Sequence, residues 1–177
     1  SESGTSLDPI LDDVTEGVGD FSRIQEIRSA VDADIIAYFT SVSDQNACGL
    51  GWLNDDLDTI SNLSSAAKYG ASVSSMVCST ITETFAHEVG HNMGGAHDRF
   101  VVTDDLPGPQ RYNFGYEDTA HLFLDNMSYS HKCTAESVTC TVIPYFSNPD
   151  VSYSGAPVGI AVSQPEAAHV SRRVTEI

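Results

Sequence analysis

Positive charge is scarce in this sequence. Its 177 residues include 8 lysine and arginine residues against 25 aspartate and glutamate residues, and the net charge is −17. Proteins that bind nucleic acids or anionic membranes need clustered positive charge to neutralise phosphate groups. The composition therefore argues against both kinds of partner, and most of the carboxylates are expected on a solvated surface.

Long apolar runs are also absent. No segment approaches the roughly 18 consecutive apolar residues that a membrane-spanning helix needs, so we expect no insertion into a membrane. No signal peptide is recognisable, which predicts either a cytosolic protein or a processed mature form. With 41% hydrophobic residues the chain can bury a sizeable core, and its length favours a single domain.

The four cysteines lack the Cys-x-x-Cys spacing of a metal or redox site. An even number of cysteines fits two disulfides in an oxidising compartment, which favours a secreted, processed protein. Three connectivities are possible. We favour Cys133–Cys140, which closes the short loop, together with Cys48–Cys78; four free buried thiols are the alternative.

The most informative segment is residues 87–98, His-Glu-Val-Gly-His-Asn-Met-Gly-Gly-Ala-His-Asp. His87 and His91 are four residues apart, so a helix presents both imidazoles on one face, where they can bind one metal ion. Gly94 is expected to end this helix and to allow a turn that brings His97 in as a third nitrogen ligand. Three protein ligands leave one position of a zinc ion open for water, as in catalytic zinc sites.

Glu88 adds a carboxylate beside these histidines. It could take a proton from a metal-bound water and later deliver it to a leaving amine, as general base and then acid. The alternative is an amphipathic helix with incidental histidines, but three clustered unliganded imidazoles would need other partners to be buried. The segment therefore predicts a zinc-dependent hydrolase.

These residues resemble the zinc-binding consensus of the metzincin metallopeptidases, and Asp98 after the third histidine is most similar to the adamalysin or reprolysin branch. The resemblance implies an α+β fold: a metzincin-like catalytic domain with a twisted mixed sheet, helices above the zinc cleft, and an irregular lower subdomain with a C-terminal helix. It implies one catalytic domain over residues 1–177, with an upper subdomain over 1–97 and a lower one over 98–177.

Metzincins also have a methionine turn, and Met127 is the one methionine that follows the zinc motif. We expect Met127 to form an apolar floor beneath the ligands, and Asp98 to be a buried hydrogen-bond anchor rather than a ligand. For Tyr129 two roles stay open: a catalytic one, or core packing or a hydrogen bond. Its Met-x-Tyr spacing is similar to astacins and serralysins, where the phenol approaches the metal, whereas adamalysins lack this role.

The resemblance extends beyond the motif, to bacterial reprolysin-like and peptidyl-Asp metallopeptidases, at three segments: residues 33–36, 48–53 and 145–150. It implies a secreted zinc endopeptidase acting on protein or peptide substrates, with Gly49–Leu53 as an edge strand that pairs with the substrate. Two substrate preferences are possible for the residue after the scissile bond: aspartate, or a broad or apolar set. A preference for aspartate would need a cation in the pocket, and Lys132 and Arg111 are the nearest candidates in the sequence.

Other expectations concern what accompanies this domain. Family members have a strand, a helix and a second strand before the region that matches residues 1–40. We therefore expect either a reduced upper sheet or a cleaved N-terminal fragment that remains bound to an exposed sheet edge. Calcium is compatible with Asn148-Pro149-Asp150 but not required. The alternative functions are a catalytically silent, zinc-containing binding module and a zinc hydrolase of non-peptide amides.

Hydrophobic periodicity predicts where the regular elements lie. We expect a first helix with Ser6 as N-cap and apolar residues through Val18, and a second over residues 21–31 that buries Ile24, Ile27 and Val31. Residues 34–40 read as an internal strand, and 49–53 and 71–77 as further strands. A capping box over residues 80–83 opens the zinc-motif helix, and a last helix begins near residue 163.

Overall fold

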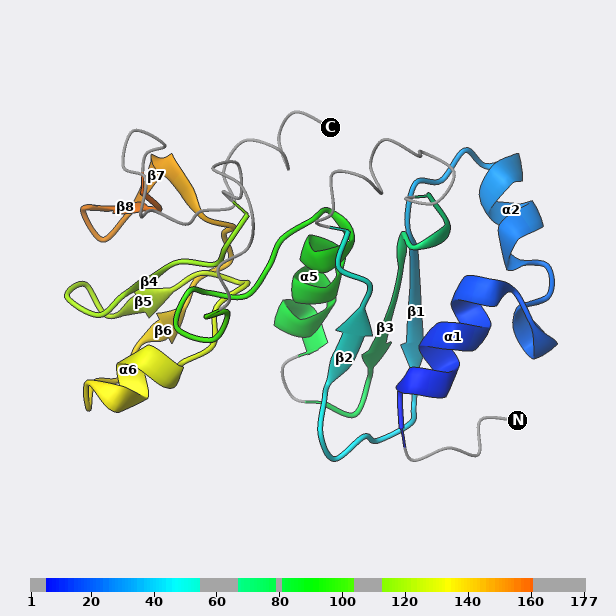
Figure 1. Ribbon diagram of the computed structural model, residues 1–177, viewed down its shortest axis with the longest axis horizontal. Helices are drawn as coiled ribbons and strands as arrows, with labels where there is room; N and C mark the ends of the chain where they lie inside the picture. The colour runs from blue at the N-terminus through cyan, green and yellow to red at the C-terminus, as the bar shows by residue number, and fades with distance from the viewer. Residues whose placement is uncertain (1–5, 55–66, 79–80, 104–112, 161–177) are drawn as a thin grey trace. The chain divides into compact units, whose positions relative to one another are not determined.

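The computed structural model describes residues 6–54, 67–78, 81–103 and 113–160 (Figure 1). It divides into two compact units, Ser1–Met93 and Gly94–Ile177. Both helices and open mixed sheets occur, so the predicted α+β class is confirmed. The predicted C-terminal helix and the Thr80 end of the capping box lie outside the described residues.

The first unit consists of a three-stranded sheet with helices. Its elements are α1 (Asp8–Glu16), the 3-10 helix η1 (Gly19–Phe21), α2 (Ile24–Ala30), β1 (Ile36–Thr40), β2 (Gly49–Gly51), β3 (Ala71–Ser75) and α5 (Ile81–Asn92). The strand order is β1-β3-β2, with β1 parallel and β2 antiparallel to β3. The sheet is therefore mixed, as expected.

Helix α1 supplies one wall of the core of this unit. Leu7, Ile10, Leu11 and Val14 recur at helical spacing and are buried against β-strand residues such as Val73. Pro9 fits the first turn, where its missing N–H leaves no hydrogen bond unmade. The helix ends at Gly17, whose φ of 64° is a left-handed conformation that glycine adopts without strain.

Three expectations about these helices are wrong. Leu7 rather than Ser6 occupies the N-cap position of α1, although the Ser6 hydroxyl accepts a hydrogen bond from the Asp8 amide. Val18 lies beyond the Gly17 cap and is 45% exposed. In the second helix region Ile27 and Val31 are 53% and 67% exposed, and Ile24 alone of the three predicted residues packs against the core.

The two faces of the sheet differ in the size of their side chains. Leu50 of β2 lies opposite Val73 of β3, and both belong to the core that α1 covers. The neighbouring residues of β2, Gly49 and Gly51, lie opposite Ser74 and Ser72 of β3. Because successive residues of a strand point to opposite faces, these four small residues form the other face. They allow α5, which contacts both strands, to approach the sheet closely.

Strand β1 was predicted to be internal, and the structure corrects this. Among the described strands β1 lies at an edge of the sheet, beside β3. Ile36 and Thr40 are buried, whereas Ala37 and Phe39 on the alternate face are exposed. A short apolar run cannot distinguish a strand covered on two faces from one covered on a single face, which explains the error.

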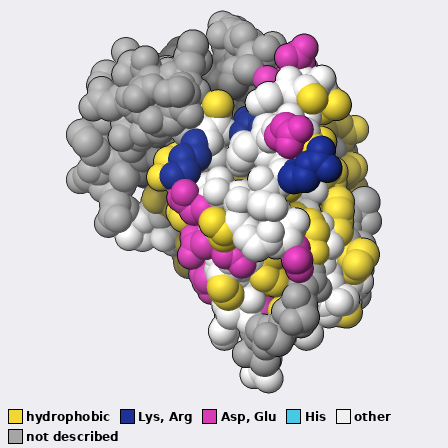
Figure 2. Space-filling model, turned by 90° about the vertical axis from the view of Figure 1, so that its right-hand side faces the viewer, with side chains coloured by type: hydrophobic (Ala, Val, Ile, Leu, Met, Phe, Trp, Pro, Cys, Tyr) yellow, Lys and Arg dark blue, Asp and Glu magenta, His cyan; other side chains and the backbone are white. Residues whose placement is uncertain are grey.

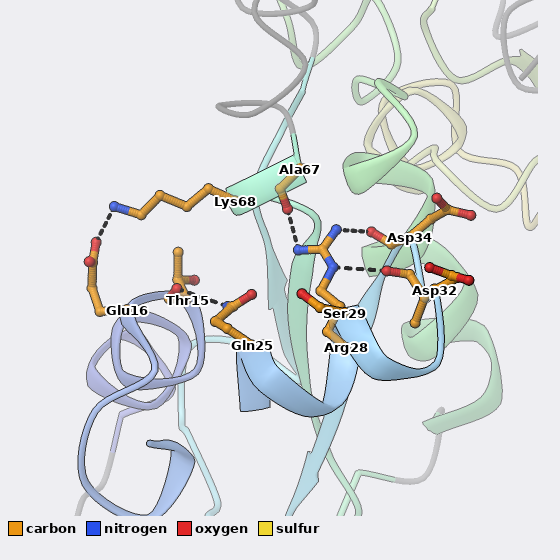
Figure 3. A pocket seen from close by; sticks show the side chains of 10 residues that line it. Thr15, Glu16, Gln25, Arg28, Ser29, Asp32, Asp34, Ala67 and Lys68 are labelled. Carbon is orange, nitrogen blue, oxygen red and sulfur yellow. Dashed lines mark hydrogen bonds and ion pairs between the residues drawn. The ribbon is translucent and has the colours of Figure 1, made fainter. Parts of the chain in front are cut away.

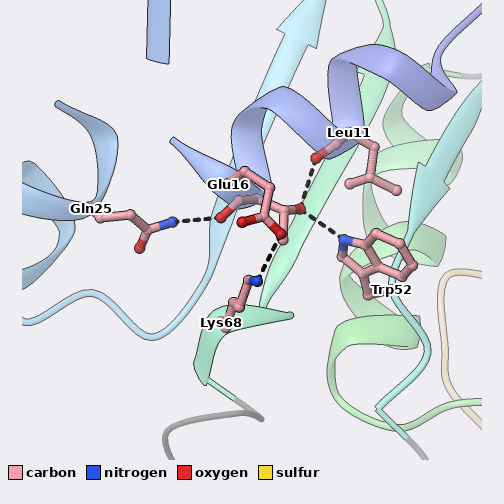
Figure 4. Close-up of polar contacts among 6 residues, drawn as sticks. Leu11, Glu16, Gln25, Trp52 and Lys68 are labelled. Carbon is pink, nitrogen blue, oxygen red and sulfur yellow. Dashed lines mark hydrogen bonds and ion pairs between the residues drawn. The ribbon is translucent and has the colours of Figure 1, made fainter. Parts of the chain in front are cut away.

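Polar contacts join the end of α1 to the sheet (Figure 4). The Thr15 hydroxyl donates to the Leu11 carbonyl at 2.7 Å and accepts a hydrogen bond from the Trp52 indole N–H at 2.7 Å. The Gln25 amide donates to the Thr15 carbonyl, and Lys68 forms an ion pair with Glu16 at 2.7 Å. Because Thr15 is buried, these bonds satisfy polar groups that would otherwise be costly inside the protein.

A polar hollow of about 750 Å³ lies next to these contacts (Figure 3). Arg28 points into it and donates to three backbone carbonyls, those of Ala33, Asp34 and Ala67. Arg28 therefore ties the turn before β1 to the segment that leads into β3. None of the residues predicted from the zinc motif lines this hollow.

The face that carries α1 and α2 has a mixed surface. Figure 2 shows hydrophobic, basic and acidic side chains interspersed across it rather than gathered in one patch. Within the described residues, no helix has the length and apolar content to cross a membrane.

Most elements of the second unit are short, although one strand has six residues. Its elements are β4 (Glu117–Asp118), β5 (Phe123–Leu124), α6 (His131–Ala135), β6 (Thr141–Val142), β7 (Asn148–Tyr153) and β8 (Ala156–Val158). β5 pairs antiparallel with β4 and parallel with β6, and β7 and β8 form an antiparallel pair. A small core surrounds Phe123 and Ile143. The low hydrophobic periodicity of this region is consistent with its short strands and long turns.

Both disulfides join the cysteines that the sequence favoured. Cys48–Cys78 joins the start of β2 to the segment after β3 in the first unit. Cys133–Cys140 closes the turn after α6 in the second unit. Each unit therefore holds one covalent cross-link.

Candidate metal centre

Helix α5 carries two of the three predicted metal ligands. His87 and His91 lie one turn apart, and their ring centroids are 4.6 Å apart with planes at 89°. His91 is buried and His87 is half-buried. The helical spacing of four residues is therefore what brings the two imidazoles together.

The chain turns directly after this helix. Gly94 has a φ of 90°, a conformation that side chains rarely tolerate, and its carbonyl accepts a hydrogen bond from the Asn113 side chain at 2.6 Å. Ala96 then forms an isolated bridge with Phe114, in which the Ala96 amide donates to the Asn113 carbonyl. Gly94 thus ends the helix as predicted, and the bridge sets the direction of the chain at His97.

The side chains of His87, His91 and His97 form a group that could hold a metal ion. One potential ligand atom from each lies within 4.8 Å of the others. Nitrogens bound to one tetrahedral zinc ion lie about 3.4 Å apart, so small ring rotations would bring the three onto a shared ion. Three neutral imidazoles suit zinc better than magnesium or calcium, which prefer oxygen ligands. The donor set therefore fits the predicted metal.

Glu88 packs against β2, where only glycine leaves room for it. A Cβ atom at Gly49 would lie 2.7 Å from the Glu88 Cγ, and one at Gly51 would lie 2.6 Å from the Glu88 carbonyl oxygen. The carboxylate side chain is buried at 6% exposure, and loss of solvation raises its pKa to about 8. A nearby cation would favour the ionised form. The environment is thus suited to a carboxylate that exchanges a proton next to a metal.

Two asparagines hold the end of α5 beside the sheet. The Asn92 side chain donates to the carbonyls of Trp52 and Ala71, at 3.0 and 2.9 Å. The Asn54 amide donates to the His91 carbonyl, and its side chain donates to the Asn92 carbonyl. The two Asn54 bonds satisfy carbonyls at a helix C-terminus that have no partner within the helix, and the two Asn92 bonds tie the helix end to the sheet. They also fix the turn of the helix that carries His91.

Asp98 is a buried anchor in the second unit. Its Oδ1 accepts hydrogen bonds from the amides of Phe100 and Val101, and its Oδ2 accepts one from the Tyr129 amide at 3.0 Å. The side chain is 2% exposed. Because Asp98 follows His97 directly, it links a predicted metal ligand to the segment around Met127.

That segment is a tight turn built around a second buried carboxylate. Asp125 Oδ1 accepts hydrogen bonds from the Met127 amide and the Ser128 hydroxyl. Met127 is fully buried, as expected of an apolar floor, and a Cβ atom at Gly115 would lie 2.6 Å from the Ser128 Oγ. Burial raises the pKa of Asp125 to about 7. The turn therefore depends on one carboxylate and one glycine.

The comparisons with known proteins agree with this arrangement. Residues 3–98, more than half of the chain, match the model of the reprolysin-like proteins of metallopeptidase family M12B. The chain belongs to this family. The family and the histidine group together indicate a bound metal. The predicted metzincin-like assignment is thus confirmed.

Three bacterial relatives of this reprolysin-like chain are peptidyl-Asp metalloendopeptidases. That of Stenotrophomonas maltophilia strain R551-3 is 36% identical over 87 residues, which cover 49% of this chain and 20% of that protein. Those of Xanthomonas campestris and Pseudomonas fragi are each 36% identical, over 18% and 51% of their own lengths. The chain thus spans only about a fifth to a half of these relatives.

One solved structure is similar over nearly the whole reprolysin-like chain. It is described as a chaperone-substrate complex; the match has a TM-score of 0.63 and 16% identity, and covers 99% of this chain and 27% of that one. At this identity the match concerns the fold alone.

The structure places Tyr129 beside His97, with ring centroids 4.4 Å apart, and leaves 41% of it exposed. The ring of His131 also lies near Tyr129, with ring centroids 5.5 Å apart. In the sequence, His131 lacks a partner at metal-ligand spacing, which predicts an ordinary polar position. The signal that could have found it is its place two residues after Tyr129, at the start of α6.

Arg111 and Lys132 are the two cations that the sequence offers for binding a substrate carboxylate. Arg111 lies outside the described residues. Lys132 is half-buried, and its charge lowers the pKa of Glu117, which burial and the neighbouring Asp98 raise to about 7 overall. Lys132 therefore serves at least in part to offset buried negative charge in its own unit.

Proposed function

We propose that this chain is the catalytic part of a zinc-dependent metalloendopeptidase that hydrolyses peptide bonds. The observation that carries the proposal is the group of three histidines on and after α5, with the buried carboxylate of Glu88 between two of them in sequence. Membership of metallopeptidase family M12B and the likeness to peptidyl-Asp metalloendopeptidases support the same conclusion. In this proposal both units contribute to one catalytic domain.

His87, His91 and His97 would hold the metal. Bound zinc polarises a substrate carbonyl and acidifies a water molecule. Glu88 accepts a proton from the attacking water and delivers it to the nitrogen of the leaving amine, so its carboxylate is regenerated after each turnover. The glycines of β2 keep this carboxylate against the sheet, where it is shielded from solvent.

Substrate would pair with β2 as an added strand. β2 lies at an edge of the sheet among the described strands, so its outer backbone groups can bond to an extended peptide. Asp98 and Met127 support the metal centre from below without touching substrate. Tyr129 is a candidate to steady the carbonyl oxygen, because its exposed ring adjoins His97.

The two disulfides support an oxidising, extracellular location. The exposed alternate face of β1 and its place at an edge of the described sheet support the expected pairing with a retained polypeptide segment. A mass spectrum of the native protein that contains no second polypeptide would contradict that pairing. Calcium binding remains an expectation from sequence.

The test is digestion of a proteome-derived peptide library by the zinc-loaded protein, with new termini identified by mass spectrometry. Cuts that disappear with a chelator and in the Glu88→Ala variant are expected. No cuts from zinc-loaded protein would contradict the proposal and would favour the silent zinc-binding module. Cuts retained in Glu88→Ala would contradict the assigned base.

A further inference from the structure

We propose that His131 is a specificity-determining residue whose imidazole binds the side-chain carboxylate of an acidic substrate residue next to the scissile bond. The proposal rests on the proposed peptidase function and adds the group that recognises the substrate side chain. It concerns a histidine outside the metal ligand set.

A short series of rings places His131 near the metal centre. The rings of His97 and Tyr129 have centroids 4.4 Å apart, and those of Tyr129 and His131 are 5.5 Å apart. His131 is therefore within about 10 Å of a metal ligand. Consecutive Cα atoms of a peptide are about 3.8 Å apart, so a side chain next to the bond under attack falls in this range.

The position is open to a ligand. Tyr129 is 41% exposed and His131 is exposed, whereas Met127 in the same turn is fully buried. Met127 therefore supports the fold, whereas Tyr129 and His131 face outward. A substrate side chain could reach the His131 ring without displacing the core.

The other basic side chains described in the second unit are placed differently. His121 pairs with Asp118 at 2.8 Å. The Arg99 guanidinium lies over the Phe114 ring. Lys132 is half-buried, and its charge lowers the pKa of Glu117. Within the described part of this unit, His131 is the exposed basic side chain whose ring adjoins Tyr129.

Charge explains why a dedicated group is needed. A chain with a net charge of −17 repels acidic peptides at long range, so recognition of a carboxylate requires a local donor. An imidazole can donate a hydrogen bond to a carboxylate whether it is neutral or protonated. The relatives are peptidyl-Asp metalloendopeptidases, which agrees with an acidic residue at the cleavage site.

The first experiment compares two peptides that differ only by aspartate or asparagine next to the scissile bond. In the zinc-loaded full chain, His131→Gln is expected to lower kcat/KM for the aspartate peptide by about 10- to 100-fold, the effect of losing a hydrogen bond to a charged group. The value for the asparagine peptide is expected to stay unchanged. His121→Gln is the matched control, and it should preserve the preference for aspartate.

A second readout does not require turnover. The same two peptides are titrated calorimetrically into the Glu88→Ala variant with and without His131→Gln, and the aspartate preference in Kd is expected to vanish with His131. Three results would overturn the proposal. His131→Gln could weaken binding of both peptides equally, or the chain could show no aspartate preference before the substitution. The preference could also disappear with Lys132→Gln and not with His131→Gln. Binding with an aspartate preference but no cleavage by the unsubstituted chain would contradict the peptidase function and still support His131.

Discussion

In the first unit, the apolar side of α1 packs on a sheet, and α5 lies against strands of glycine and serine. In the second unit three of the five described strands are only two residues long, and buried carboxylates organise the turns. Asp98 and Asp125 accept backbone hydrogen bonds there, and Glu117 is buried near both. Packing on one sheet thus dominates the first unit, and buried carboxylates supplement short strands in the second.

This difference predicts which changes should lower the stability of each unit. Apolar burial depends little on pH, whereas a buried carboxylate changes its contribution to stability as it titrates. Apart from the buried carboxyl of Glu88, the first unit should therefore respond most to changes in shape, and the second to changes in charge. The following substitutions compare the two.

The largest effect is expected at Glu88 in the first unit. Glu88→Ala should lower peptide cleavage by about 10²- to 10⁴-fold, because the general base is lost. The free energy of unfolding should stay the same or rise, because burial raises the pKa of this carboxyl and its charged form is costly. Glu83→Ala, an exposed carboxylate on the same helix, is the control. A fully active Glu88→Ala variant would rule out the assigned role.

Removal of the disulfides compares the units directly. Cysteine-to-serine replacement of Cys48–Cys78, which spans 30 residues, should cost about 4 kcal/mol in the chain-entropy model. The same change at Cys133–Cys140, which spans 7 residues, should cost about 2 kcal/mol. Chemical denaturation measures both, and a larger loss from the shorter loop would contradict this ranking.

One glycine in each unit tests the effect of a change in shape. Gly51→Ala would place a methyl group 2.6 Å from the Glu88 carbonyl oxygen, and Gly115→Ala would place one 2.9 Å from the Met127 carbonyl carbon. Each should lower the free energy of unfolding by about 1–3 kcal/mol, because backbone must move. We expect Gly51→Ala to reduce cleavage as well, since it displaces Glu88. Thermal denaturation and peptide assays would show whether either methyl group is accommodated.

The smallest effect concerns pH and the second unit. The folded pKa of Glu117, about 7, lies above its ordinary value of 4.5, so the folded state retains a proton that the unfolded chain releases. Stability from this group is complete at low pH and is lost as pH rises through about 7. Glu117→Gln should therefore stabilise the protein by roughly 1–2 kcal/mol near pH 8 and have little effect near pH 4. Asp12→Asn, at an exposed position of α1, should show no such difference in denaturation curves.

The parts of the site that sequence predicts best are local. Histidines at helical spacing and the Gly94 turn need only nearby residues, so their arrangement follows from the motif. The sequence predicts an ordinary polar position for His131, because its relation to His97 depends on how Asp98 holds the segment around Tyr129, 31 residues after Asp98.

Burial was harder to predict than periodicity. Ile27 and Val31 have the spacing of a buried helix face, yet Ile27 within α2 and Val31 just after it are both exposed. The roles of Gly49 and Gly51 also depend on tertiary contact, because only the packing of α5 shows what their missing side chains make room for.

The hydrogen bond between the Tyr129 amide and Asp98 offers an observable of its own. A backbone amide held by a buried carboxylate exchanges its proton with solvent only when the bond opens. Asp98 is covalently next to His97, so the exchange rate at Tyr129 reports how firmly the turn is held beside the metal centre. A single amide resonance could therefore follow metal loading in solution, without any substrate.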